Sequence, residues 1–114
     1  MSDDILDIFG EDNAAIATAL AALGHHTRLA IYRLLVRAGD EGLNVGEVGA
    51  HLGCPASTMA HHLSTLVDAG LVTQERQGRQ IVNRADFAAM RRTIGFLTDE
   101  CCTGVTPIKN ESAA

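Results

Sequence analysis

The sequence predicts a small, mostly α-helical fold with one β-hairpin, in the order α-α-α-α-β-β-α. The first observation behind this prediction is the length of 114 residues, which is that of one small domain. The second is the composition, because 46% of the residues are hydrophobic and 20% are charged, as in a globular chain rather than a disordered one. The third is the pattern: apolar residues recur at helical spacing between glycine breaks, except in two short segments around Gly78 that are typical of strands.

Three helices are expected in the first half of the chain, over residues 13–23, 25–38 and 45–52. Apolar residues at helical spacing mark the buried faces of the first two helices. The residues expected to face inward are Ile16, Leu20, Leu23, Leu29, Leu35 and either Ile31 or Tyr32. Asn44 is suited to cap the third helix, and Gly53 ends it.

A fourth helix is expected over 55–69, because Pro55 suits a first turn and Gly70 stops the helix. Its apolar face consists of Met59, Leu63, Leu66 and Val67. The opposite face carries small hydroxyl side chains and a histidine, namely Ser57, Thr58, His61, Ser64 and Thr65. Such donors near a helix N-terminus can approach phosphates and base edges in a DNA major groove. For this helix alone, an ordinary solvated face is the competing interpretation.

Two strands are expected over 71–76 and 79–84, joined by a turn at Gln77-Gly78. Arg76 and Arg79 flank this turn, and arginines at the tip of a hairpin can follow phosphates or reach into a minor groove. A hydroxyl-bearing helix face and a basic hairpin at this spacing together favour binding of double-stranded DNA over a merely solvated surface.

A last helix is expected from Phe87 to Cys101 or Cys102, with Asp86 suited to cap it. Its apolar positions form a narrow seam that suits packing against another helix: Phe87, Met90, Ile94 and Leu97. Two short helices joined by a glycine turn and followed by a hairpin form a winged helix-turn-helix.

The net charge of −5 is unevenly distributed along the chain. Residues 1–12 carry five acids and no base, whereas residues 25–92 carry eight arginines against six acids. This asymmetry suggests a partner for the mildly basic middle of the chain. We therefore expect an acidic N-terminal tail at 1–12, a DNA-binding and dimerisation domain at 13–102 and a flexible C-terminal tail at 103–114.

Several classes of protein are excluded by the same sequence. No apolar run reaches the roughly 18 residues that a membrane span needs, and the acidic N-terminus is unlike a secretory signal. Three cysteines, two of them adjacent, do not suit a disulfide scaffold, so a cytoplasmic protein with no membrane partner is expected. An enzyme is not expected, because the adjacent cysteines have no nearby base and form no Cys-x-x-Cys motif.

Four segments carry a resemblance to known proteins: Ala22-Leu23-Gly24-His25-His26-Thr27-Arg28-Leu29, Ser57-Thr58-Met59-Ala60-His61-His62-Leu63, Ala69-Gly70-Leu71-Val72 and Arg76-Gln77-Gly78-Arg79. Over about residues 14–102 the chain resembles the ArsR/SmtB family of small winged helix-turn-helix repressors. The resemblance implies a homodimer joined mainly through the first and last helices. Such a dimer binds a pseudo-palindromic operator and leaves it when a ligand binds.

The resemblance also implies which residues contact DNA. The helix at 55–69 would lie in the major groove. The residues expected to contact DNA are Ser57, Thr58, Ala60 and His61 on this helix, and Arg76 and Arg79 in the hairpin. His62 is expected to pack against the rest of the domain. The family often has Asp-Pro where this chain has His25-His26, so the second helix is expected to lose a preferred cap, and a structural histidine pair is favoured over a metal site.

The cysteines suggest the inducing ligand. Residues 44–48 contain no cysteine and the last helix contains no histidine, so two ligand sets found in the family are missing. Cys101 and Cys102 remain, and they resemble the adjacent cysteines of arsenic-responsive members. Soft thiolates select thiophilic centres, so trivalent arsenic, as arsenite or methylarsenite, is the expected inducer, and no obligatory cofactor is expected.

The number of thiols bears on which arsenical is favoured. Arsenite has three exchangeable positions and methylarsenite has two, so a pair of thiols suits methylarsenite relatively well. Cys54 would be a third ligand only if the fold brings it near the pair. Redox or persulfide sensing by the same cysteines is the alternative, and a disulfide between Cys54 and either of the others would favour it.

Overall fold

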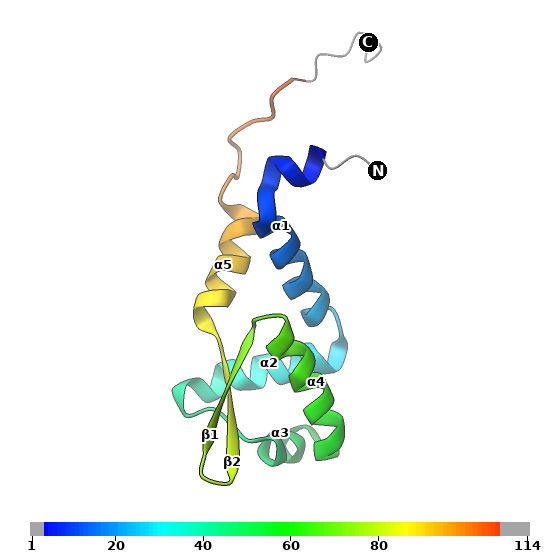
Figure 1. Ribbon diagram of the computed structural model, residues 1–114, viewed down its shortest axis with the longest axis vertical. Coiled ribbons are helices and arrows are strands. Elements are labelled where there is room, and N and C mark those ends of the chain that lie inside the picture. The colour runs from blue at the N-terminus through cyan, green and yellow to red at the C-terminus, as the bar shows by residue number, and fades with distance from the viewer. Residues whose placement is uncertain (1–3, 108–114) are drawn as a thin grey trace.

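The computed structural model describes residues 4–107, and their side chains from residue 12 onward. Its elements are helix α1 (Asp4–Leu23), helix α2 (His26–Ala38), the 3-10 turn η1 (Gly39–Glu41), helix α3 (Val45–Leu52), helix α4 (Ala56–Asp68), strands β1 (Val72–Gln77) and β2 (Gln80–Ala85), and helix α5 (Phe87–Thr98). The predicted order of helices and strands is confirmed, with the 3-10 turn added after α2. Helices α2, α3 and α4 and the hairpin form the body of the molecule, and α1 and α5 extend from the same side of it (Figure 1).

The hydrophobic core lies where α1, α2, α3, α4 and the hairpin meet. Its largest fully buried apolar side chains are Ile31, Tyr32, Leu35, Val48, Met59, Leu63, Leu66 and Leu71. The prediction that Leu20 and Leu29 face inward is wrong, because their exposed fractions are 41% and 45%. The small side chains of Ala19 and Ala22 face the core instead of Leu20, which lets α1 approach closely. In α2, both Ile31 and Tyr32 point inward together with Leu35, and Leu29 lies outside that arc.

Side chains cap three of the described helices, and the predicted Asp86 cap of α5 is confirmed by a hydrogen bond from the Ala89 N–H at 3.1 Å. The Asn44 carboxamide oxygen accepts a hydrogen bond from the Glu47 N–H at 2.8 Å, and the Glu47 carboxylate accepts one from the Asn44 N–H at 2.9 Å. This capping box confirms the predicted start of α3. Helix α2 lacks the preferred capping residue, as expected, but it is still capped, because Nδ1 of His25 accepts a hydrogen bond from the Thr27 N–H at 3.2 Å. An unprotonated imidazole nitrogen thus replaces the carboxylate oxygen at this N-cap.

The two ends of the chain differ in structure. Helix α1 begins at Asp4, so residues 4–12, expected as an acidic tail, are helical. In the expected C-terminal tail, residues 103–107 are exposed and belong to no helix or strand. Residues 1–3 and 108–114 lie outside the described part. Within residues 4–107, no helix combines the length and the hydropathy required to cross a bilayer.

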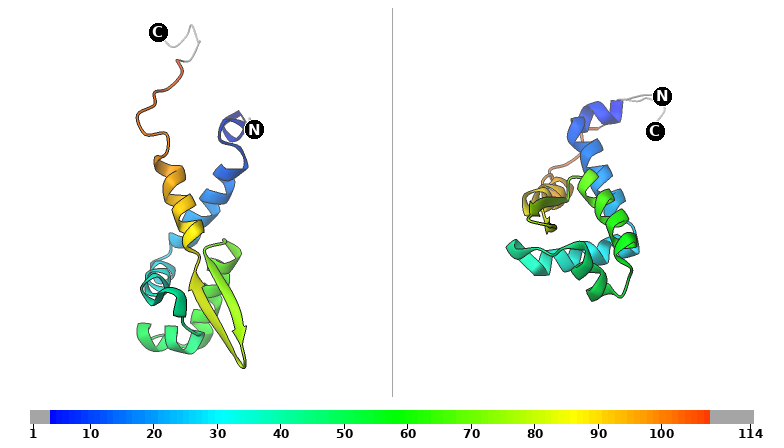
Figure 2. Two further views of the ribbon diagram at one scale, coloured as in Figure 1. Left: turned by 90° about the vertical axis from the view of Figure 1, so that its left-hand side faces the viewer. Right: turned by 60° about the horizontal axis from the view of Figure 1, so that its bottom comes forward.

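The hairpin is a two-stranded antiparallel sheet whose pairs run from Val72–Ala85 at its base to Gln77–Gln80 at its tip. Each strand lies one residue later than predicted, because the turn falls between Gln77 and Gln80, with Gly78 at a φ of +64°. The hairpin runs along one side of the body, and its tip stands clear of the helices (Figure 2).

The base of the hairpin is joined to the loop that precedes α3. Leu43 and Asn83 exchange two backbone hydrogen bonds, of 3.0 and 2.8 Å. Gly42 has a φ of +64°, and a Cβ atom at this position would lie 2.5 Å from the backbone oxygen of Asn83. The close approach of loop and strand therefore requires glycine at position 42.

Candidate DNA-binding surface and thiol pair

Helix α4 packs one face against the core and exposes the opposite, open face to solvent. Met59, Leu63 and Leu66 are at most 1% exposed, and they anchor the helix in the core. The side chains predicted to contact DNA, those of Ser57, Thr58, Ala60 and His61, are all exposed. The predicted division of this helix into an apolar face and an open face is therefore confirmed.

The N-terminus of α4 is uncapped by any side chain. Pro55 occupies the N-cap position and supplies no side-chain hydrogen bond, and the first turn contains no acid. The first N–H groups of a helix lack intrahelical acceptors and carry the positive end of its dipole. This end of α4 therefore suits an anion such as a DNA phosphate.

The hairpin supplies the second part of the surface. Arg76 and Arg79 are exposed, and Arg79 lies in the turn at the tip. A groove of about 380 Å³ separates the hairpin from α4, and Ala60 and Arg79 both line it. The fold thus brings one predicted contact from the helix and one from the hairpin to the same groove. Ser57, Thr58 and His61 lie outside the groove lining, on the open face of α4, and Arg76 is paired with Ile81 in the sheet.

His62 joins α4 to the start of α2. Its ring centroid lies 4.7 Å from that of His25 and 5.8 Å from that of His61. Its Nδ1 atom is buried and has no hydrogen-bond partner among the described residues. Burial lowers the pKa of His62, and the nearby charges of His25, Arg28 and His61 lower it further. The expected packing role of His62 agrees with this arrangement.

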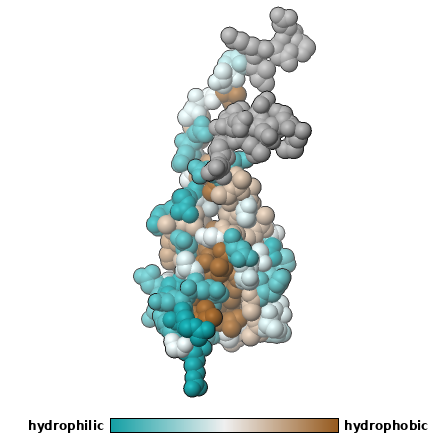
Figure 3. All heavy atoms as spheres, viewed as in Figure 1, coloured by the Kyte–Doolittle hydropathy of each residue, from teal (hydrophilic) through white to brown (hydrophobic). Residues whose placement is uncertain are grey.

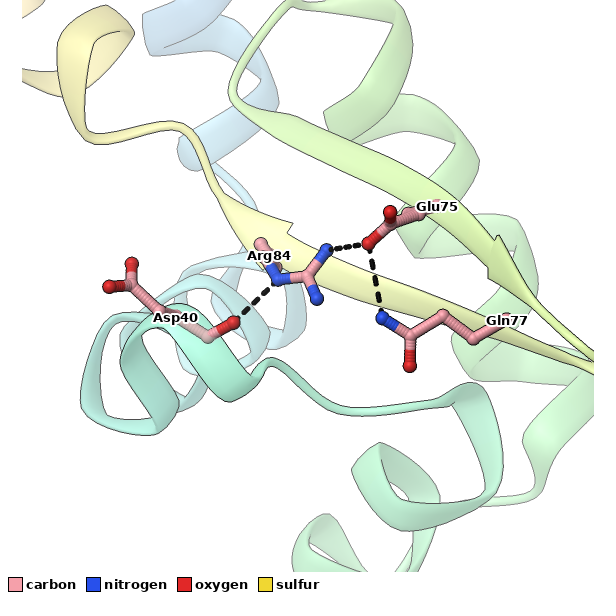
Figure 4. Close-up of polar contacts among 4 residues, drawn as sticks. All are labelled: Asp40, Glu75, Gln77 and Arg84. Carbon is pink, nitrogen blue, oxygen red and sulfur yellow. Dashed lines mark hydrogen bonds and ion pairs between the residues drawn. The ribbon is translucent and has the colours of Figure 1, made fainter.

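Arg84 belongs to the basic middle of the chain, but its guanidinium forms hydrogen bonds with other residues of the protein. Its Nε atom donates to the backbone oxygen of Asp40 at 2.6 Å, and its Nη1 atom donates to the Glu75 carboxylate at 2.7 Å (Figure 4). The Gln77 carboxamide also donates to that carboxylate, at 3.1 Å. The hydrogen bonds from Arg84 and Gln77 and the charge of Arg84 hold the pKa of Glu75 below its ordinary value.

The sequence alone did not separate Arg84 from the other arginines. The available signal was the hairpin register, because Arg84 pairs with Thr73, which places Glu75 on the neighbouring diagonal position. The Arg84–Glu75 contact can be predicted only if the strand register is known to the exact residue. The predicted strands were displaced by one residue, so the contact was missed.

Cys101 and Cys102 lie in a turn after α5, whereas they were expected at the end of that helix. The helix ends at Thr98, and both cysteines are exposed. Their Sγ atoms are 3.0 Å apart, and Cys102 adopts a φ of +64°, which is uncommon for a residue other than glycine. The hydrogen bond between the thiols raises the pKa of Cys101, and desolvation raises it further.

Cys54 is separate from this pair within one chain. It lies in the turn between α3 and α4, is half-buried, and its thiol contacts the Leu52 carbonyl oxygen at 3.6 Å. The described residues contain no group of three His, Cys, Asp or Glu side chains that could hold a metal ion. A single protomer therefore offers two neighbouring thiols in this part of the structure.

Helices α1 and α5 expose apolar side chains. Ile94 and Leu97 of the predicted α5 seam are 55% and 60% exposed, and Leu20 of α1 is also exposed. The view of Figure 3 also shows apolar surface in the middle of the visible face of the molecule. A groove of about 540 Å³ between these helices is lined by residues that include Ile16, Phe96 and Asp99.

Comparison with known proteins finds similar regulators. A helix-turn-helix domain family matches residues 23–75. The HTH-type transcriptional regulator CmtR of Mycobacterium bovis is 31% identical over 107 residues, which cover 87% of this chain and 88% of that protein. A putative arsenical resistance operon repressor ArsR of Halobacterium salinarum is 43% identical over 60 residues, which cover 53% of this chain and 46% of that protein. An ArsR-like transcriptional regulator from Rhodococcus sp. RHA1 has a TM-score of 0.71 at 29% identity, covering 79% of this chain and 82% of that one.

Proposed function

Because the chain belongs to the ArsR family of winged helix-turn-helix transcriptional regulators, we propose that it is a repressor that leaves its operator when a trivalent arsenical binds Cys101 and Cys102. This family consists of DNA-binding regulators and not of enzymes. The observation that carries the arsenical part of the proposal is the pair of exposed thiols whose Sγ atoms are 3.0 Å apart.

DNA binding is assigned to the open face of α4 and to the hairpin tip. Helix α4 enters the major groove with Ser57, Thr58, Ala60 and His61, all of which are exposed. Arg79 and Arg76 follow the flanking backbone from the hairpin. The uncapped N-terminus of α4 supports this orientation, because it favours a phosphate at the start of the helix.

A homodimer presents two such surfaces to a pseudo-palindromic operator. The proposed contact is made by α1 and α5, whose exposed apolar residues Leu20, Ile94 and Leu97 would be covered by a second copy. Burial of apolar side chains of this size contributes about 1.5–3 kcal/mol each when it is complete. The two α4 helices then meet successive turns of the major groove on one side of the duplex.

The thiol pair suits methylarsenite better than arsenite. Each thiol replaces one hydroxyl group on arsenic, and its proton leaves with that hydroxyl as water. Two thiols thus satisfy both exchangeable positions of methylarsenite, whereas arsenite keeps a third hydroxyl. The separation of Cys54 from the pair within a protomer supports a two-thiol site.

Release of DNA requires that arsenic binding and dimer geometry be coupled. The thiols follow α5 by a few residues, and α5 is one of the two helices assigned to the dimer contact. An arsenic atom bridging both sulfurs fixes the turn beyond α5, and the helices that set the spacing of the two α4 helices respond. A coupling free energy of about 1–3 kcal/mol is typical of such linked sites.

The test is a side-by-side titration of inducers. The full-length protein first selects a duplex from a random-sequence pool, and its release from that labelled duplex is followed by fluorescence anisotropy. We expect release by methylarsenite at lower concentration than by arsenite, and no release by zinc. Equal responses to the two arsenicals would contradict the two-thiol selectivity, and release by zinc would contradict a thiol-selective site.

Redox sensing is the second candidate, and the 3.0 Å separation of the two sulfurs favours it as well. A small persulfide would oxidise the two thiols to a disulfide and leave as one thiol and hydrogen sulfide. Adding a persulfide in the same titration, with mass spectrometry of the product, distinguishes this reaction by the loss of two hydrogens from the protein. Release without that loss would reject the redox mechanism.

A further inference from the structure

The hairpin is fastened to the body on its outer face by Arg84. This guanidinium bridges the Asp40 backbone oxygen in η1 and the Glu75 carboxylate in β1, with hydrogen bonds of 2.6 and 2.7 Å (Figure 4). Gln77, near the tip, donates to the same carboxylate at 3.1 Å. One continuous set of hydrogen bonds therefore runs from the body of the molecule to the end of β1.

A second set of hydrogen bonds holds the opposite face. Asn83 and Gln74 are direct partners in the sheet, and their neighbours Arg84 and Glu75 point to the other face, because side chains alternate along a strand. The Gln74 carboxamide donates to Asn83 at 2.8 Å, and the Asn83 carboxamide donates to the Leu43 backbone oxygen at 3.1 Å. Asn83 is only 1% exposed, so this contact is shielded from water.

These two networks, together with the hydrogen bond that the Asn44 carboxamide before α3 donates to Gln80 at 2.7 Å, hold the hairpin and its tip. A two-stranded hairpin has little stability of its own, and its orientation depends on what it is attached to. The tip carries Arg79, which lines the groove opposite Ala60 of α4. A small rotation at the base of the hairpin moves Arg79 much farther than it moves Arg84.

We propose that Glu75 and Arg84 are positioning residues for DNA recognition, which hold the hairpin at the angle that carries Arg79 to the DNA backbone without touching DNA themselves. The inference rests on the DNA-binding function proposed above. It assigns a favourable role to an acid on a surface that binds a polyanion.

The positioning role and simple electrostatics predict opposite changes in DNA affinity when Glu75 is removed. Removing a carboxylate from a DNA-binding surface reduces repulsion and, by charge alone, strengthens binding. If Glu75 positions the hairpin, removing its side chain makes the hairpin tip more mobile. Forming the DNA complex then costs additional conformational entropy, because the tip must be ordered on binding. Binding is therefore expected to weaken when the negative charge is lost.

Three variants of the full-length protein test the proposal on the duplex selected by the wild type. Glu75→Ala removes the charge and the hydrogen-bond acceptor, whereas Glu75→Gln removes the charge and keeps an oxygen that accepts from Arg84. Glu41→Ala removes an exposed acid of η1 and serves as the charge-matched control. We expect Glu75→Ala to bind about three- to tenfold more weakly than the wild type, Glu75→Gln to lie between them, and Glu41→Ala to bind at least as tightly as the wild type.

The comparison of the two Glu75 variants separates positioning from charge, because both carry the same net charge. The inference is overturned if Glu75→Ala binds as tightly as the wild type or more tightly, or if Glu75→Gln and Glu75→Ala bind equally. A wild type that selects no duplex would overturn the proposed function and this inference with it. Weakening by Glu75→Ala with recovery in Glu75→Gln supports the positioning role.

Discussion

The contact between His25 and His62 makes two histidines part of the packing that holds helix α4 against the start of α2. His25 accepts the Thr27 N–H through an unprotonated nitrogen, which makes it the cap of α2. His62, on α4, lies with its ring centroid 4.7 Å from that of His25 and near the permanent charge of Arg28. Burial and the neighbouring charges of His25, Arg28 and His61 favour the neutral form of His62.

Acidification is therefore expected to destabilise the fold. The pKa of His62 in the folded protein is lowered from 6.5, so the unfolded chain takes up a proton first as the pH falls. The stability that depends on neutral His62 is fully present above pH 6.5 and is lost as the pH falls from there through the folded-state pKa. Urea unfolding at about pH 7.5 and about pH 5.5 measures this loss, which His62→Gln should reduce. The exposed His51 on α3 gives the control His51→Gln; an equal pH dependence in the wild type and His62→Gln would contradict the account.

At the level of elements, the sequence predicted those features that depend on neighbouring residues. Asn44 caps α3 and Asp86 caps α5, because a cap needs only the few residues that follow it. The exposure of Leu29 was missed, because it depends on how distant segments pack, and the helical structure of residues 4–12 was missed as well. The histidine cap was missed for another reason: Asp and Asn are the usual caps, and only the geometry of His25 shows that its Nδ1 can replace them.

A side chain at position 42 is expected to destabilise the contact between the loop before α3 and the hairpin. Gly39 and Gly42 have nearly the same φ, +65° and +64°, but a Cβ at Gly42 would collide with the Asn83 backbone, whereas one at Gly39 would meet nothing within 4 Å. We expect Gly39→Ala to cost about 1 kcal/mol from backbone strain, and Gly42→Ala to cost about 2 kcal/mol more because strand β2 must move. Denaturant unfolding gives both values, and equal costs would contradict the close approach.

For the whole molecule, the exposed apolar residues of α1 and α5 are those that the proposed homodimer would cover. The candidate surface was predicted from sequence because its residues gather within one helix and one turn. The dimer contact was predicted only through resemblance, and Ile94 and Leu97 appear as exposed side chains when one copy is viewed alone. The position of the thiols was predicted within a few residues, whereas their separation from Cys54 depends on the distance between the α3–α4 turn and the end of α5, which no local pattern contains.

The central claim is that Cys101 and Cys102 together sense a trivalent arsenical and release DNA. The most direct measurement is methylarsenite-induced release of the selected duplex by Cys101→Ser, Cys102→Ser and, as the control, Cys54→Ser. All three variants are expected to bind the duplex as the wild type does, because Cys101 and Cys102 lie outside the surface assigned to DNA and the half-buried thiol of Cys54 contacts the Leu52 carbonyl oxygen instead of facing that surface. Only Cys54→Ser should then be released at the wild-type concentration of methylarsenite, while the other two stay bound. Release of Cys101→Ser and Cys102→Ser at that same concentration would contradict the account.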